Sequence, residues 1–174
     1  VLRPGSPSSS SSPATGPPKN PPPSSLAAGR IVALKGIGGF QLLADACNEL
    51  AVARLRQRKH REEKPFALMM PTVEAVREHC DVSPQPRPSH GIAPNVAHTS
   101  PCLGVMLPYS PLHHLLMGEF PRPVVATSGN RSDEPIATGN DEARRRHGEI
   151  ADFFLMHNRP IARPCDDSVV RLSR

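Results

Sequence analysis

The segment from Arg30 to Met70 constrains the fold more than any other part of the sequence. Residues 31–34 form a short apolar run, long enough for a buried strand and too short for a helix. Gly36, Gly38 and Gly39 follow directly, and glycines allow positive φ or a close approach of the backbone to a ligand. The pattern therefore predicts a strand that runs into a glycine turn.

A helix and a cationic loop are predicted after the glycines. Asn48 suits an N-cap, and an apolar stripe at helical spacing follows, formed by Ala51, Val52 and Leu55. The other face and the next loop carry the cations Arg54, Arg56, Arg58, Lys59, Arg61 and Lys64. Pro65 ends the helix, and residues 66–70 have the composition of a second strand. We interpret the segment as a βαβ-like unit whose loop suits an anion.

Charge and composition narrow the function classes. The chain carries a formal net charge of +5, and residues 30–64 hold eight Lys and Arg against four acids. A local surplus of this kind indicates phosphate-bearing partners, either a nucleotide or a nucleic-acid backbone. The single tyrosine and the absence of tryptophan argue against base-stacking platforms.

The first 28 residues are predicted to be a disordered segment, because residues 1–25 hold 8 prolines, 8 serines and 2 glycines. Residues 29–174 then suit one domain with one core. No apolar stretch approaches the roughly 20 residues of a membrane span, and no secretory signal is visible. The four cysteines form no CxxC pair, so we expect reduced, buried thiols, no metal site and a cytoplasmic location.

The rest of the chain alternates between strands and helices. Apolar runs predict strands at 103–107, 124–127, 152–156 and after Asp167, and helices are predicted after Thr72, from Ser110 to Gly118 and over 142–147 with Thr138 or Asn140 as the cap. This alternation indicates an α/β class with a mostly buried sheet. His113 and His114 are adjacent and so cannot face the same way on a helix, which disfavours a metal role.

Two polar stretches keep two interpretations each. A strand that ends in Thr127-Ser-Gly-Asn130 is typical of ligand contacts at a strand's carboxyl end, and equally of an ordinary Asx or Ser turn. Asp166 and Asp167 could bind a divalent ion or simply end a loop, and their adjacency favours the loop.

Five motifs, taken together and in this order, resemble the YrdC-like domain of HypF, the carbamoyltransferase that matures nickel-iron hydrogenases. They are Lys35-Gly-Ile-Gly-Gly-Phe40, Arg58-Lys-His-Arg-Glu-Glu-Lys-Pro65, Gly104-Val-Met-Leu-Pro108 with Leu112-His-His-Leu115, Thr127-Ser-Gly-Asn130 and Asp166-Asp-Ser-Val-Val-Arg171. The resemblance covers residues 29 to 172. It implies a YrdC-like α/β fold, a twisted mixed sheet with flanking helices around a positively charged cavity.

The resemblance also implies an activity. The YrdC-like domain of HypF joins carbamate, released from carbamoyl phosphate, to ATP, giving carbamoyl-adenylate and pyrophosphate. The carbamoyl group then passes to a hydrogenase-maturation partner protein. The implied cofactors are ATP and Mg²⁺. We expect no interaction with a membrane.

The family's motifs place site residues on this chain. By resemblance, Lys59 and Arg61 are the catalytic pair, which would hold phosphates and orient the acyl carboxylate. The implied nucleotide-binding residues are Lys35, Gly38, Gly39, Lys64, Thr127, Ser128, Asn130, Ser168 and Arg171. No general base is required, because carbamate is already an anion.

The sequence departs from the family in two places. Gln41 stands where HypF proteins commonly have His. Roughly twenty family residues, including an apolar strand, have no counterpart near residues 83–91, and losing a strand would leave backbone groups unpaired. A truncated and inactive enzyme therefore stays an open alternative. Two further functions also stay open: binding of double-stranded RNA or tRNA, and threonylcarbamoyl-adenylate synthesis for tRNA modification.

Overall fold

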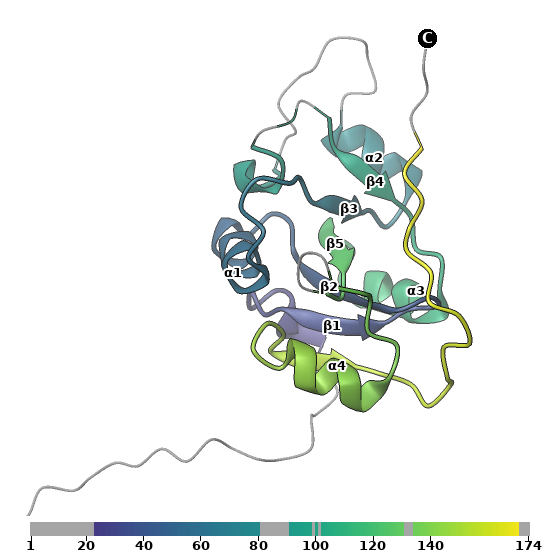
Figure 1. Ribbon diagram of the computed structural model, residues 1–174. Helices are drawn as coiled ribbons and strands as arrows, with labels where there is room; N and C mark the ends of the chain where they lie inside the picture. The colour runs from purple at the N-terminus through teal and green to yellow at the C-terminus, as the bar shows by residue number, and fades with distance from the viewer. Residues whose placement is uncertain (1–22, 81–90, 99, 101, 131–133, 171–174) are drawn as a thin grey trace, which may run out of the picture.

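A computed structural model describes residues 23–80, 91–98, 100, 102–130 and 134–170. Within these residues the chain forms one six-stranded sheet in the order β4-β3-β5-β2-β1-β6 (Figure 1). The strands are β1 (Val32–Lys35), β2 (Phe40–Asp45), β3 (Ala67–Met69), β4 (Gly104–Met106), β5 (Val124–Ser128) and β6 (Phe153–Leu155). The helices are α1 (Glu49–Lys59), α2 (Val73–His79), α3 (Pro111–Glu119) and α4 (Asn140–His147), with short 3₁₀ turns η1 (Pro23–Ser25) and η2 (Pro94–Val96).

The sheet is mixed, which confirms the expected α/β class. Its four central strands are antiparallel to one another, since β1 pairs with β2, β2 with β5, and β5 with β3. The two outer pairs, β3 with β4 and β1 with β6, are parallel. A parallel pair needs a crossover connection, and the segments that carry α2 and α4 lie in these two connections.

The predicted βαβ-like unit is wrong, because the glycine turn closes a hairpin. The N–H of Gly36 donates to the carbonyl of Gly39 at 2.8 Å, and β2 returns antiparallel along β1 with Val32 opposite Leu43. All six residues of β2 are buried, including the polar Gln41 and Asp45. Because these two residues interrupt the apolar run, the sequence pattern did not indicate a strand here. The strand at 67–69 then pairs with β4 and β5 rather than with β1.

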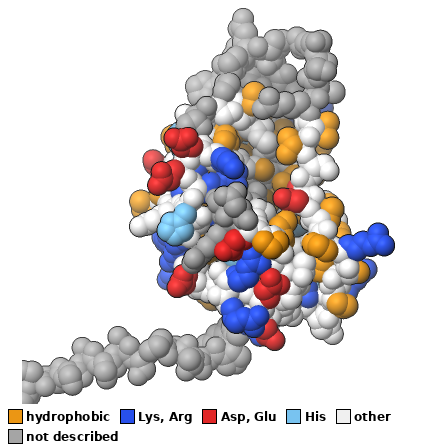
Figure 2. Space-filling view, in the orientation of Figure 1, with side chains coloured by type: hydrophobic (Ala, Val, Ile, Leu, Met, Phe, Trp, Pro, Cys, Tyr) orange, Lys and Arg blue, Asp and Glu red, His pale blue; other side chains and the backbone are white. Residues whose placement is uncertain are grey.

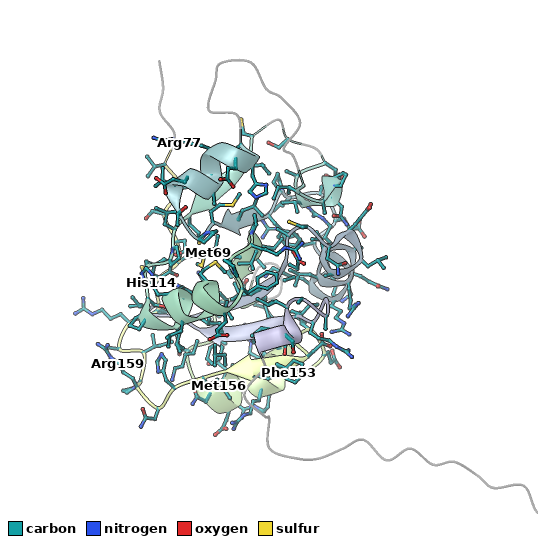
Figure 3. All side chains as sticks on the ribbon, turned by 180° about the vertical axis from the view of Figure 1, so that it is seen from behind. Met69, Arg77, His114, Phe153, Met156 and Arg159 are labelled. Carbon is teal, nitrogen blue, oxygen red and sulfur yellow. The ribbon has the colours of Figure 1, made fainter. Side chains whose placement is uncertain are left out.

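Each face of the sheet has its own apolar cluster. One cluster joins residues of β2 and β5 to Ala51, Val52 and Leu55 of α1 and Ala143 of α4. The other joins the opposite side chains of the same strands to Met117 of α3. Figure 3, seen from behind, shows α3 lying across this second face, where Met69 and Phe153 also lie.

The predicted starts of three helices are confirmed by their caps. Side-chain oxygens of Asn48, Thr72 and Ser110 accept the N–H groups of Ala51, Ala75 and His113 at 3.0, 3.1 and 3.3 Å. These bonds satisfy donors that a first helical turn leaves unpaired. The fourth start differs, because α4 begins after Gly139 and the carboxylate of Glu142 accepts the N–H groups of Thr138 and Gly139.

Three further expectations need correction. No strand follows Asp167 within the described residues, and Val169 and Val170 are 90% and 84% exposed. The predicted disordered segment extends too far, because Pro23–Ser25 form a turn and Leu26 is buried in the second cluster; residues 1–22 lie outside the described residues. Cys102 and Cys165 are exposed rather than buried.

Residues 91–98 seal one end of the first cluster. Val96 is fully buried, and its carbonyl accepts the N–H of Phe66 at 2.9 Å. Ala93 donates to the carbonyl of Ala46 at 2.9 Å. This segment therefore links the end of β2 to the residue before β3. Residues 81–90, where family sequence was expected to be missing, lie outside the described part of the chain.

Candidate functional site

The carboxyl end of α1 meets the carboxyl end of β5 through Lys59. This lysine is the last residue of the helix and its side chain is only 2% exposed. Its ammonium donates to the carbonyl of Ser128 at 2.7 Å, to the carbonyl of Asn130, and to Oδ1 of Asn130 at 3.1 Å. Two segments 69 residues apart in sequence are thus joined by one cation.

These three bonds use every donor of the Lys59 ammonium. Lys59 therefore shapes the Ser128–Asn130 turn, and Ser128 completes that turn by donating from Oγ to Oδ1 of Asn130 at 2.7 Å. Burial and, second to it, the charge of Arg61 lower the pKa of Lys59 to about 8. A cation with a depressed pKa is stabilised when an anion arrives, so this end of the sheet suits a phosphate or carboxylate.

A left-handed residue brings Arg61 back to the same place. His60 ends α1 with φ of 53°, and its N–H donates to the carbonyls of Arg56 and Gln57. The chain then reverses, and the Arg61 guanidinium donates from Nη2 to the carbonyl of Pro65 at 2.8 Å. Its Nη1 lies 3.4 Å from Oγ1 of Thr127. Lys59 and Arg61 consequently lie against adjacent residues of one strand end.

Arg56 organises the loop that carries these cations. Its guanidinium donates to five main-chain carbonyls, those of Arg61, Glu62, Lys64, Asn95 and Val96, at 2.6–3.1 Å. It also stacks 4.5 Å from the ring centroid of Phe66. A rigid planar donor of this kind fixes several loop carbonyls at once.

The rest of the predicted cation cluster points elsewhere. Arg58 donates to Asp152 at 3.0 Å and to the carbonyl of Ile150 at 2.8 Å, and Arg54 donates to the carbonyl of Gly29 at 3.3 Å. Lys64 is exposed. Over the described residues of the face in Figure 2, Lys and Arg side chains are interspersed with acidic ones. The cations that are clustered in the sequence are therefore separated in space. Of these cations, only Lys59 and Arg61 contact the strand end at Thr127 and Ser128.

A pocket lies beside this strand end. It is lined by Gly38, Gly39, Phe40, Gln41, Tyr109, Ser128, Ile136, Cys165, Asp166 and Asp167. Gly38 and Gly129 have no room for a side chain: a Cβ on Gly38 would lie 2.4 Å from the carbonyl oxygen of Cys165, and one on Gly129 would lie 2.6 Å from that of Phe40. The glycines thus allow a close approach of the backbone, as the sequence suggested. The atoms that they approach belong to other segments of this chain.

The predicted site residues fall into three groups. Those at the strand end and pocket are Gly38, Gly39, Lys59, Arg61, Thr127, Ser128 and Asn130. Lys35 is buried on β1 and donates to the carbonyl of His157 at 3.3 Å, and it does not line the pocket. Lys64 and Ser168 are exposed and do not line the pocket, and Arg171 lies outside the described residues.

Tyr109 is a pocket residue that the sequence interpretation missed. It precedes the Ser110 cap of α3, and its hydroxyl accepts a hydrogen bond from Nε2 of Gln41 at 2.8 Å. Tyr109 is the single tyrosine of the chain, and this was the one feature of the sequence that could have drawn attention to it. Asp167 was weighed as a metal ligand or a loop end, and in the structure its carboxylate accepts from the same Gln41 nitrogen at 2.7 Å.

Fold and site together define a class, the α/β domains in which a basic helix end meets a Ser-Gly-Asn strand end beside a glycine-lined pocket. The Sua5_yciO_yrdC family, described as "Telomere recombination", matches residues 24–174, and this chain belongs to that family. The sheet and its helices accordingly have the YrdC-like arrangement that the sequence motifs implied.

The relatives of this chain include carbamoyltransferases named HypF. That of Rhodobacter capsulatus is 48% identical over 165 residues, which cover 84% of this chain and 22% of that protein. A structure of full-length HypF in the phosphate- and nucleotide-bound form superposes with a TM-score of 0.77 at 47% identity, covering 83% of this chain and 25% of the other. The structure of HypF from T. kodakarensis superposes with a TM-score of 0.78 at 37% identity, covering 84% of this chain and 21% of the other.

This chain therefore corresponds to a YrdC-like part of HypF and spans about a fifth of the curated relatives' length. None of the described helices is long and apolar enough to cross a bilayer.

Proposed function

We propose that this chain joins carbamate to ATP, giving carbamoyl-adenylate and pyrophosphate, as one step of carbamoyl transfer in hydrogenase maturation. The observation that carries the proposal is the buried ammonium of Lys59 at the Ser128–Asn130 turn, with Arg61 against the preceding Thr127. A similar HypF structure was obtained in a phosphate- and nucleotide-bound form, which supports a nucleotide as the ligand of this site.

The reaction asks little covalent chemistry of the protein. A carbamate oxygen forms a bond to the α-phosphorus of ATP, and the bond from that phosphorus to the bridging oxygen of pyrophosphate breaks. Two anions must therefore be held in line while negative charge grows on the departing group, which requires positioning and fixed positive charge. Lys59 and Arg61 supply that charge at a place where burial strengthens it.

The donor set fits a triphosphate with its magnesium ion. The Arg61 guanidinium offers planar paired donors for phosphate oxygens, and the hydroxyls of Thr127 and Ser128 stand at the same strand end. Magnesium takes oxygen ligands and keeps several waters, so the phosphates would supply most of its other ligands, and the Ser128 hydroxyl would offer a neutral oxygen. Carbamoyl phosphate would be the source of carbamate, and a maturation protein the acceptor.

An RNA-binding function has weaker support. Contacts to an RNA backbone need exposed cations, whereas Arg54, Arg56 and Arg58 donate to carbonyls or a carboxylate of this chain. A steep loss of RNA affinity between low and physiological salt would favour that function. Threonylcarbamoyl-adenylate synthesis uses the same chemistry on another acyl group, and threonine with bicarbonate in place of carbamate tests it.

Exchange of labelled pyrophosphate into ATP, in the presence of carbamate and Mg²⁺, is the direct experiment. We expect exchange that depends on carbamate, strongly reduced in Lys59→Ala and little changed in Arg54→Ala, because Arg54 lies away from the strand end. A full-length HypF serves as the positive control. If it exchanges and this chain does not, the proposal fails for this chain, and equal losses in the two variants would contradict the assigned site.

A further inference from the structure

Gln41 is a buried amide whose orientation is fixed from behind. Its side chain is 5% exposed, and Oε1 lies 3.0 Å from Nε2 of His113, a fully buried residue of α3. Burial lowers the pKa of His113 to about 4, so its ring is neutral near pH 7 and carries one N–H. That N–H must donate from Nε2, because the facing atom is an amide oxygen.

This orientation turns the amide nitrogen of Gln41 toward the pocket. Nε2 donates to the hydroxyl of Tyr109 at 2.8 Å and to Oδ2 of Asp167 at 2.7 Å. A flipped amide would place its oxygen against the Asp167 carboxylate, two acceptors facing each other. Tyr109 also contacts His113 edge-on, with ring centroids 4.6 Å apart. The imidazole therefore supports both groups.

Tyr109 completes a pair of donors around one carboxylate. Its hydroxyl accepts from Gln41, which leaves its own proton for Asp167. Burial raises the pKa of Tyr109, and the charge and hydrogen bond of Asp167 raise it further, as expected for a phenol that donates to an anion. The polar wall of the pocket is thus built for a planar carboxylate, and Asp167 fills that position.

Asp167 reaches the pocket on a lightly held segment. All of residues 162–170 are exposed, and the segment is joined to the hairpin by the bond from the Cys165 N–H to the Gly38 carbonyl at 3.0 Å. Figure 1 shows it after β6 as an extended coil along the outside of the molecule. A segment with few buried apolar contacts opens at small cost.

We propose that Gln41 and Tyr109 recognise the carboxylate of a small planar acid, and that the Asp167 carboxylate is an internal competitor which this acid displaces. The inference rests on the proposed function for the identity of the acid, which would be carbamate. The pocket that these residues line also contains Ser128 of the strand end. An acid bound there would stand beside the residues assigned to the phosphates.

Formate is the probe that tests the site without nucleotide. Tyr109 is the only tyrosine, and the chain has no tryptophan, so intrinsic fluorescence reports on this wall alone. We expect formate to change the emission of the unmodified chain in a saturable way, while formamide and equimolar chloride do not. Asp167→Ala should tighten formate binding about tenfold, the effect of losing one charge-assisted competing bond.

Asp141→Ala is the matched control, because Asp141 is an exposed acid of α4 that pairs with Arg144 and does not line the pocket. Its formate affinity should equal that of the unmodified chain. Gln41→Leu should abolish the response, with folding checked by thermal melting. Equal affinities in the unmodified chain, Asp167→Ala and Asp141→Ala would overturn the proposal, as would identical responses to formate and chloride. Because no ATP is present, this result is independent of pyrophosphate exchange.

Discussion

The Lys59 ammonium lies 2.7 Å from the main-chain carbonyl oxygen of Ser128, so a helix end and a strand end form one rigid unit. The lysine donates to the turn and at the same time places a buried positive charge beside the pocket. An arriving anion can draw on that charge, and the position of Ser128 and Asn130 depends on it. Binding and local structure are coupled at this point.

The depressed pKa of Lys59 predicts a pH-dependent affinity for ATP. Phosphate binds the charged ammonium, and the folded-state pKa is about 8 against an ordinary 10.5. The charged fraction therefore falls as pH rises through 8, and ATP affinity should fall with it, by up to tenfold per pH unit. Calorimetric titrations from pH 7 to 9.5 measure this, and binding above pH 8 should take up a proton.

Lys59→Arg is the control for that experiment, because a guanidinium stays charged throughout this range. Its ATP affinity should be nearly constant with pH. A decline as steep as that of the unmodified chain would assign the titration to another group.

Arg56→Lys should weaken ATP binding although Arg56 does not line the pocket. A lysine has three donors and cannot serve five carbonyls in one plane. We expect about 2 kcal/mol of lost stability and about tenfold weaker ATP binding, because the 60–65 loop loses its fixed shape. Urea unfolding and calorimetry measure the two effects. Arg54→Lys, which changes a single 3.3 Å bond, should leave stability and ATP affinity nearly unchanged. An Arg56→Lys variant with unchanged ATP affinity would show that the shape of the loop does not matter for binding.

Buried histidines should make the fold sensitive to mild acid. Burial, aided by the charges of Arg146 and Lys59, lowers the pKa of His147 to about 4. Between pH 6.5 and 4 the unfolded chain binds a proton that the folded chain does not, so stability falls as pH falls through this window. The slope approaches 1.4 kcal/mol per pH unit for one such group, and His113 adds in the same direction.

Urea unfolding at pH 7, 6 and 5 measures that slope. His147→Phe should reduce it, since a phenyl ring can pack beside Phe40, whose ring centroid is 6.4 Å from that of His147. Gln57→Ala, an exposed change that removes no ionisable group, should leave the slope as it is. If the slope is undiminished in His147→Phe, His147 does not cause the loss of stability in acid.

Gly129→Ala should destabilise the protein by about 3 kcal/mol, the upper range for a forced overpacking. The new Cβ would lie 2.6 Å from the Phe40 carbonyl oxygen and 2.8 Å from its carbon, and backbone atoms cannot move aside cheaply. Gly118→Ala in α3 is the matched control, with nothing within 4 Å of the added carbon. It should stabilise the helix by up to about 1 kcal/mol. Thermal melts of the two variants that shift in the same direction would contradict this.

The sequence alone determined most local elements. Capping by Asn48, Thr72 and Ser110 and the apolar runs of five strands were visible, because caps and periodic burial act over a few residues. The interior strand β2 was missed, since burial on both faces removes the alternation that marks a strand and Gln41 and Asp45 break its apolar run. The motifs also indicated the family, which the match over residues 24–174 confirms.

Only the tertiary structure decided which charges share a site. Arg58 and Lys59 are neighbours in the sequence, but successive helical residues point in different directions, so one meets Asp152 and the other meets Ser128. The approach of Asp167 to Gln41 joins residues 126 positions apart. Such contacts depend on how the sheet orders its strands, which no local pattern specifies.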